Sequence, residues 1–157
     1  MQVQRREVVT FIAVFAFVCV CFYLMLDNTA ISLTESDGYR VFVRKKCEFK
    51  RGEYVSFKPP KSAKYAPRGF YFIKKIMCVP GDVIERDGRW FYCNGKKLAY
   101  ALKKTKWGAP LEPWNIKKIV VPENTFFVKG SMWRSYDSRY FGLIHKKDII
   151  ACYRPLF

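Results

Sequence analysis

The sequence is poor in the residues that most hydrolytic and metal sites use. His145 is its one histidine, and no two cysteines have the CxxC spacing of a metal site. A zinc centre is therefore not expected, and neither is any other metal or cofactor. A Ser-His-Asp triad has little support, because His145 lies deep in a basic C-terminal stretch.

Acidic residues are also scarce. The chain has 13 Asp and Glu against 29 Lys and Arg, which gives a formal net charge of +16. Such a surface favours anionic partners or serves solubility alone. For a domain tethered to a membrane, the expected partner is the acidic headgroups of lipids, with no nucleic acid, and the chain is expected to be a monomer.

Only one long apolar run is present, Val8–Leu26, without a charge over nineteen residues. As a helix it spans roughly 28 Å, close to the hydrocarbon thickness of a bilayer. Arg5 and Arg6 precede it, so the positive-inside rule places the N-terminus in the cytoplasm. The alternative is a cleaved signal peptide, but residues 27–30 match a cleavage site poorly. The expected parts are a cytoplasmic N-terminus (1–7), a transmembrane anchor (8–26) and an outer domain (27–157).

Six cysteines divide between these parts. Cys19 and Cys21 lie in the apolar run and are expected to act as small hydrophobic residues. The other four could form two disulfides in an oxidising compartment, with three connectivities open. Cys78 with Cys93 is favoured because both are expected on neighbouring strands, which leaves Cys47 with Cys152.

Strand patterns dominate the outer part. Asp87-Gly88 and Asn94-Gly95 are hairpin signals, and residues 103–118 are expected to form a long loop. No internal repeat and no amphipathic helix beyond the anchor is evident. One small, strongly twisted all-β domain is expected after one transmembrane helix. Strands are expected at 39–43, 54–57, 70–77, 82–85, 89–93, 119–121, 125–128 and 149–153.

A lysine in an apolar stripe is the most informative feature. In the run Phe70–Asp82, two-residue alternation places Lys74 on one face with Phe70, Phe72 and Ile76, and Lys75 on the other. Burying an ammonium is costly unless it is paired or neutral, and a neutral lysine can act as a base. The alternative is that both lysines extend to solvent from an edge strand.

A serine hydroxyl needs such a base to become a nucleophile. Ser32 follows the anchor closely, and Lys74 could reach it if their two strands pair. A further polar segment is Ser135-Tyr136-Asp137-Ser138-Arg139-Tyr140-Phe141-Gly142. Each serine taken alone is more often a turn or cap residue than a nucleophile.

Together and in this order, these features resemble the type I signal peptidases (peptidase family S26). The resemblance rests on the anchor, the serine beyond it, Ile73–Ile76 leading into Val79–Asp82, and the Ser-x-Asp-Ser-Arg segment. The short chain, Asn28-Thr29 before the serine and Gly38-Tyr39 after it look most like the TraF-type pilin peptidases of conjugative plasmids. The implied fold is the small β-barrel-like fold of signal peptidases.

The resemblance also implies a Ser-Lys dyad. The oxyanion would be held by the Ser32 backbone N–H, possibly joined by a second donor. The implied roles are nucleophile for Ser32, general base for Lys74, orientation of the lysine amine for Ser135, a supporting ion pair for Asp137 with Arg139, and a tight turn for Gly81.

Two departures from the family pattern leave alternatives open. The family usually has proline soon after the nucleophile, whereas Leu33-Thr34-Glu35-Ser36 follows Ser32, so Ser36 is an alternative nucleophile. The glycine in 129–134 is shifted by one position from the usual Gly-Asp-Asn-Arg pattern. The loop that shapes the substrate cleft, and with it the specificity, is therefore expected to differ.

The resulting prediction is a serine endopeptidase of the bacterial inner membrane with a periplasmic catalytic domain. It would process the signal, leader or tail peptide of a preprotein, foremost a conjugative pilin, alongside proteins of the conjugation machinery. Hydrolysis of the acyl-enzyme and cyclisation of the pilin both remain open. The alternative is an inactive membrane-tethered β-domain that serves as a basic binding or scaffold component of a secretion or conjugation apparatus.

Overall fold

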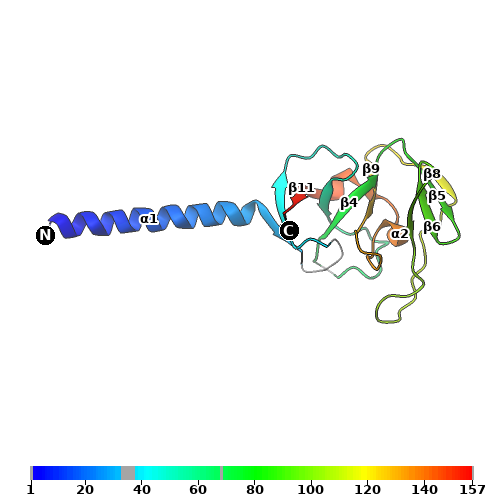
Figure 1. Ribbon diagram of the computed structural model, residues 1–157, viewed down its shortest axis with the longest axis horizontal. Helices are drawn as coiled ribbons and strands as arrows, with labels where there is room; N and C mark the ends of the chain where they lie inside the picture. The colour runs from blue at the N-terminus through cyan, green and yellow to red at the C-terminus, as the bar shows by residue number, and fades with distance from the viewer. Residues whose placement is uncertain (1, 33–37, 68, 157) are drawn as a thin grey trace.

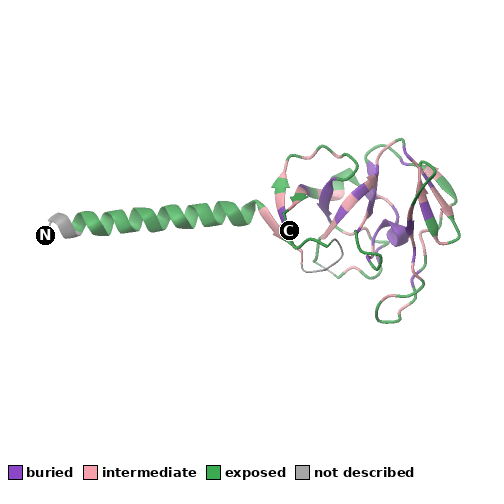
Figure 2. Cartoon of the chain, viewed as in Figure 1, coloured by how far each residue is buried: buried purple, intermediate pink, exposed green. Residues whose placement is uncertain are grey.

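The computed structural model describes residues 2–32, 38–67 and 69–156, and it places a long helix beside a β domain (Figure 1). Helix α1 (Gln2–Asp27) extends from one end of that domain. Its segment Arg5–Asp27 is long and apolar enough to cross a membrane, by length and composition. Figure 2 shows the helix exposed from Arg5 to Asp27, so nothing in the β domain covers its apolar side chains.

The β domain contains two antiparallel sheets. The larger has seven strands in the order β1-β2-β11-β3-β4-β9-β10, and the smaller has four in the order β7-β6-β5-β8. Figure 1 shows the smaller sheet at the end of the domain away from α1. The strands of the larger sheet are β1 (Thr29–Ile31), β2 (Val41–Lys45), β3 (Tyr54–Phe57), β4 (Phe72–Cys78), β9 (Thr125–Lys129), β10 (Ile144–His145) and β11 (Ile149–Pro155). Those of the smaller sheet are β5 (Val83–Asp87), β6 (Trp90–Cys93), β7 (Lys96–Tyr100) and β8 (Lys118–Val120).

Local turn chemistry sets the smaller sheet. Asn94 and Gly95 both have positive φ, 50° and 74°, which is the geometry of a tight turn whose twist matches its strands. Gly88, with φ 55°, turns β5 into β6. Both hairpin predictions are therefore confirmed, and the all-β prediction holds, since the described helices beyond α1 are the single turn α2 (Ser138–Phe141) and the 3-10 turn η2 (Lys146–Asp148).

The core lies in two clusters between and beneath the sheets, which Figure 2 shows as purple around β4, β9 and α2. Phe57, Ile76 and Val128 belong to the first cluster. Ile84, Phe91 and Phe127 belong to the second. Because β4 and β9 contribute to both clusters, these two strands hold the two sheets together.

Both favoured disulfides are present, Cys47–Cys152 and Cys78–Cys93. The reason given for the second pair was wrong. Cys78 ends β4 in the larger sheet and Cys93 ends β6 in the smaller sheet, so the bond joins two sheets and not two neighbouring strands.

Several strand boundaries also differ from expectation. Strand β1 was not predicted, and β4 begins at Phe72, so Phe70 and Tyr71 precede it and are exposed. The expected loop at 103–118 is irregular, with one bridge between Lys104 and Pro110. Strands β7 and β10 were not predicted either. Short-range patterns located the other described strands, but pairing with partners far along the chain set their ends.

Candidate active site

Lys74 lies in the middle of β4 and is buried, with 4% of its surface exposed. The face prediction is confirmed for Lys74 and Ile76, which are buried in alternation with Cys78. It is wrong for Phe70, which is exposed, and Phe72 is only half-buried. Lys74 Nζ lies 5.6 Å from the centre of the Phe72 ring. Lys75 on the opposite face is half-buried, with its Nζ 5.1 Å from the Tyr54 ring. The chain thus places one of two adjacent lysines in a dry environment.

Strand pairing brings Lys74 to the base of the loop at 130–137, which we call the Ser135 loop. Strand β4 pairs with β9 through Lys75 opposite Lys129, so one step further places Lys74 opposite Gly130. Ser135 is 4% exposed, and its Oγ has no hydrogen-bond partner among the described residues. A buried hydroxyl without a partner is uncommon in folded proteins and often marks a functional position.

The Ser135 loop is fixed from beneath by Arg139, whose side chain is 2% exposed. Its Nε and Nη2 donate to the two oxygens of Asp137 at 2.8 and 2.9 Å. Its remaining bonds go to backbone carbonyls: Nη2 to Ser135 (2.6 Å), and Nη1 to Trp133 (3.0 Å) and Tyr100 (2.7 Å). All five N–H groups of the guanidinium therefore have acceptors.

The ion pair with Asp137 also shifts the pKa of Arg139. Burial lowers the pKa of Arg139, but the Asp137 carboxylate outweighs burial and raises it above its ordinary value. The second Asp137 oxygen accepts the backbone N–H of Gly130 at 3.0 Å. Asp137 and Arg139 are thus joined beneath the loop as the sequence predicts, and the pair shapes the backbone around Ser135.

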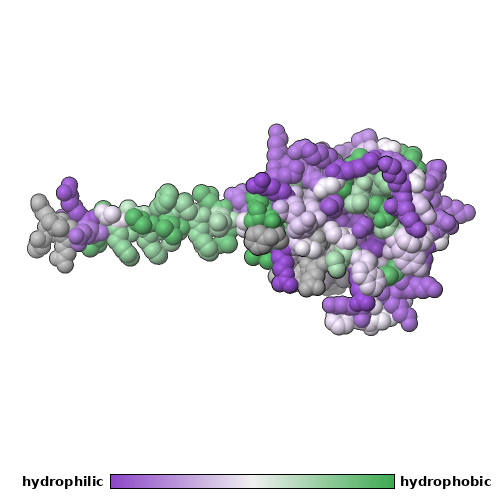
Figure 3. Space-filling model, viewed as in Figure 1, coloured by the Kyte–Doolittle hydropathy of each residue, from purple (hydrophilic) through white to green (hydrophobic). Residues whose placement is uncertain are grey.

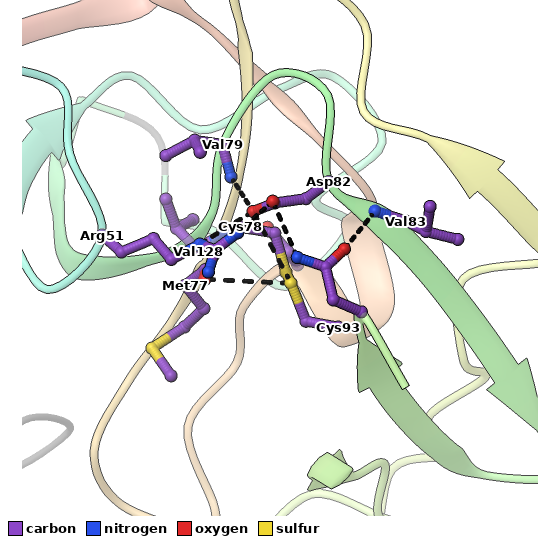
Figure 4. The surroundings of a disulfide bond; sticks show 10 residues. Arg51, Met77, Cys78, Val79, Asp82, Val83, Cys93 and Val128 are labelled. Atoms are coloured by element: carbon purple, nitrogen blue, oxygen red, sulfur yellow. Dashed lines mark hydrogen bonds and ion pairs between the residues drawn. A yellow bond between two sulfur atoms is a disulfide. The ribbon is translucent and has the colours of Figure 1, made fainter. Parts of the chain in front are cut away.

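Gly81 and Asp82 form the turn that ends β4 (Figure 4). Gly81 has a φ of 85°, which suits glycine, so its role in a tight turn fits the structure. The Asp82 carboxylate accepts from Val79 N–H (2.8 Å), Asn94 Nδ2 (3.0 Å) and Arg51 Nε (2.9 Å). Burial raises the pKa of Asp82, yet these donors together hold it below its ordinary value. Asp82 therefore ties the end of the lysine strand to both sheets.

Ser32 follows β1, at the edge of the larger sheet. Strands β2, β11 and β3 lie between β1 and β4, so the expected pairing of the serine and lysine strands is wrong. The Ser32 N–H donates to the Arg40 carbonyl at 2.8 Å, so it is engaged in the sheet and is not open to an oxyanion. The alternative nucleophile Ser36 lies outside the described residues.

Sequence reasoning missed Arg51 and Arg89 as positioning residues. Arg51 reaches Asp82 from 31 residues away, and Arg89 donates to the carbonyls of Ala101 and Leu102 at 2.8 and 2.7 Å. No sequence pattern distinguishes these two arginines from the many other basic residues of the chain. The neighbouring Cys78, Asp82 and Cys93 have ligand atoms within 4.8 Å of one another, but the two cysteines are joined as a disulfide.

A buried lysine beside a buried serine loop, on a β domain behind an apolar helix, is the arrangement expected of serine peptidases that use a lysine as base. Comparison with known proteins gives the family. The family described as "Signal peptidase, peptidase S26" matches residues 3–156. The chain therefore belongs to the signal peptidase family.

Individual relatives agree. The chain is 31% identical over 147 residues to signal peptidase I of Bacillus licheniformis, covering 85% of this chain and 74% of the relative. It is 28% identical over 144 residues to signal peptidase IB of Staphylococcus aureus, covering 80% and 72%. A crystal structure of a signal peptidase I from Enterococcus faecalis matches with a TM-score of 0.43 and 25% identity, covering 73% of this chain and 99% of the other.

Proposed function

We propose that the chain is an active, membrane-anchored serine endopeptidase in which Lys74 activates Ser32. The observation that carries this proposal is the burial of Lys74 on β4, where Lys75 next to it remains half-buried on the other face. A lysine held away from water, on the strand that leads into the Val79–Asp82 turn, is the candidate base that the chain offers. Membership of the signal peptidase family supports the same chemistry.

In the proposed mechanism, the Lys74 amine accepts the proton of the Ser32 hydroxyl as Ser32 Oγ attacks the scissile carbonyl. The leaving amine takes a proton from the lysine, and water then cleaves the acyl-enzyme. Ser135 Oγ, which has no hydrogen-bond partner among the described residues, would turn to the lysine amine and orient it during the reaction. Asp137 with Arg139 holds the backbone that carries Ser135. Because β2, β11 and β3 lie between β1 and β4, the proposal requires the two side chains to approach each other across these three strands.

The proposed topology follows from the helix and the disulfides. Arg5 and Arg6 before the apolar segment place the N-terminus in the cytoplasm and the β domain in the periplasm. Two disulfides in the β domain are consistent with an oxidising compartment. The three-part division at residues 1–7, 8–26 and 27–157 belongs to this proposal.

The proposed substrate is the extended leader or tail segment of a preprotein, bound by strand addition with small residues at alternate positions. Conjugative pilin is the preferred substrate because the short chain and the residues flanking Ser32 resemble the TraF-type peptidases. If the amino terminus of the pilin attacks the acyl-enzyme in place of water, the product is a ring. Cyclisation lowers the pilin mass by one water relative to the linear product.

Mass spectrometry of a pilin precursor made with each variant tests the proposal. Ser32→Ala and Lys74→Ala should each lower the processing rate at least about 10⁴-fold, because each removes a member of one catalytic unit. Lys75→Ala is the matched control for the lysine and should retain processing. Ser36→Ala is the matched control for the serine.

The outcomes separate the alternatives. Loss of processing in Ser36→Ala but not in Ser32→Ala would transfer the nucleophile to Ser36. Normal maturation in both Ser32→Ala and Lys74→Ala would overturn the dyad and favour the inactive basic scaffold. An equal loss of processing in Lys74→Ala and Lys75→Ala would show that processing depends on the integrity of β4 and not on the Lys74 amine.

A further inference from the structure

A basic arm, residues 103–110, projects from the half of the domain farther from α1 (Figure 1). Backbone bonds from Thr105 N to Ala109 O and from Leu111 N to Lys103 O, both 2.8 Å, fold it back on itself. Its cations Lys103, Lys104 and Lys106 are all exposed. Trp107 near the tip is 81% exposed. Neither the hydrophobic core nor the proposed dyad requires this arrangement.

A cleft of about 250 Å³ lies between the arm and the Ser135 loop. Residues 102–106 line one side, and Trp133 with Arg134 lines the other. Among the described residues, the four cations of this cleft form no ion pair. Arg134 lies 4.4 Å over the Trp133 ring, and Lys106 lies 4.3 Å over the Trp107 ring. The cleft thus combines unpaired positive charge with aromatic surface, and Figure 3 shows hydrophilic side chains over much of this face of the domain.

Both walls of the cleft are attached to the network that holds the candidate site. Arg139 donates to Tyr100 O at the start of the arm, to Trp133 O in the opposite wall and to Ser135 O. The backbone N–H of Leu102 donates to the Tyr140 hydroxyl at 2.9 Å. A segment bound in the cleft therefore contacts a wall that is one residue from Ser135.

We propose that this cleft is an exosite that binds an acidic segment of the preprotein while the scissile bond lies at the dyad. Four unpaired cations favour carboxylates, and the volume suits one or two side chains, since it is below the usual range for drug-sized ligands. Lipid headgroups are disfavoured because the arm lies in the half of the domain away from α1 (Figure 1). This exosite rests on the proposed function, since it is a site for that substrate.

The test uses the full chain in zwitterionic detergent and two precursor peptides with the same alternating small residues at the cleavage site. One peptide carries Glu and Asp away from that site, and the other carries Gln and Asn. Wild type should cleave the acidic peptide with about tenfold higher kcat/KM, as expected for several exposed ion pairs acting together. Lys104→Gln/Lys106→Gln/Arg134→Gln should bring the ratio close to one, mainly through KM.

The matched control removes three exposed lysines elsewhere, Lys61→Gln/Lys96→Gln/Lys147→Gln, and should keep the ratio of wild type. An equal fall in this control would mean that net charge alone is responsible and would overturn the exosite. A wild-type ratio of one would overturn it as well.

Binding without cleavage separates the exosite from the dyad. Fluorescence anisotropy with Ser32→Ala should show salt-sensitive binding of the acidic peptide that is lost with the three cleft substitutions. If wild type cleaves neither peptide but this binding is found, the proposed activity fails, and the cleft stands as a binding site for acidic segments without the role of an exosite. Tighter binding of a single-stranded oligonucleotide of equal charge in the same cleft would overturn the exosite in favour of nucleic acid.

Discussion

The two sheets use charge in opposite ways. Around the larger sheet, buried charges are paired: Asp137 with Arg139, and Glu53, whose side chain is fully buried, with Lys45 at 2.6 Å. Beside the smaller sheet, the basic arm leaves its cations exposed and without ion pairs among the described residues. Charges that are paired and buried hold neighbouring side chains and backbone in place, whereas exposed charges without an ion pair remain available to a binding partner. Under the two proposals above, the region with paired charges serves catalysis and the region with unpaired charges serves recognition of the substrate.

The largest expected effect comes from removing the disulfides. Cys47–Cys152 closes a separation of 105 residues, and Cys78–Cys93 closes one of 15. Loop entropy predicts losses in the free energy of unfolding of about 4.7 and about 3 kcal/mol for the respective double serine variants. Urea unfolding of the full chain in detergent, followed by tryptophan fluorescence, measures both. A larger loss for Cys78→Ser/Cys93→Ser would mean that the junction between the sheets, and not the larger sheet, limits stability.

Arg139→Met should destabilise the fold by about 4 kcal/mol, because it leaves Asp137 charged and buried. Arg51→Met is the matched control: the Arg51 side chain is 52% exposed, so its loss should be within about 1 kcal/mol. Urea unfolding compares the two.

Adding Asp137→Asn to Arg139→Met tests whether the unpaired buried charge of Asp137 causes this loss of stability. Part of the stability should return, since no buried charge then remains. If the double variant is less stable than Arg139→Met alone, the hydrogen bonds to Ser135 O and Trp133 O matter more than the charge.

Gly142→Ala should cost about 3 kcal/mol. Its added Cβ would lie 2.9 Å from the Trp114 ring, and its φ of 84° strains any side chain. Gly88→Ala in the smaller sheet is the matched control, with a φ of 55° and open space around it, and should cost about 1 kcal/mol. Equal losses in thermal unfolding would show that backbone strain alone matters and that Trp114 moves freely.

The smallest expected effect is the loss of folding stability in acid that Asp82 causes. The folded pKa of Asp82 lies below its ordinary value of 3.8, so the carboxylate stabilises the fold above that pH. This contribution is lost as the pH falls through the folded pKa. Urea midpoints between pH 6 and pH 3 should fall less in Asp82→Asn than in wild type, and Asp87→Asn, which is exposed, should follow wild type. An unchanged slope in Asp82→Asn would exclude Asp82 as a source of acid sensitivity.

Local features were predictable from sequence. The Asp87-Gly88 and Asn94-Gly95 turns, the faces of β4 and the order of the family motifs depend on neighbouring residues, so short patterns reveal them. The sheet order was not predictable, because it depends on contacts between segments far apart in the chain. For the same reason, neither the hydrogen bond from the Ser32 N–H to the Arg40 carbonyl nor the separation of β1 from β4 was predictable from sequence.

In the proposed topology the β domain is exported. The five hydrogen bonds of the Arg139 guanidinium then determine when the candidate site can form. The N-terminal anchor and Ser32 leave the translocation machinery early, and Lys74 follows 42 residues after Ser32 in the sequence. The floor of the site, however, forms only when residues 100, 133, 135, 137 and 139 are all present. Under the proposed function, Lys74 has its complete surroundings only after nearly nine-tenths of the chain has emerged. An incompletely exported chain would therefore have no finished site with which to cleave neighbouring proteins.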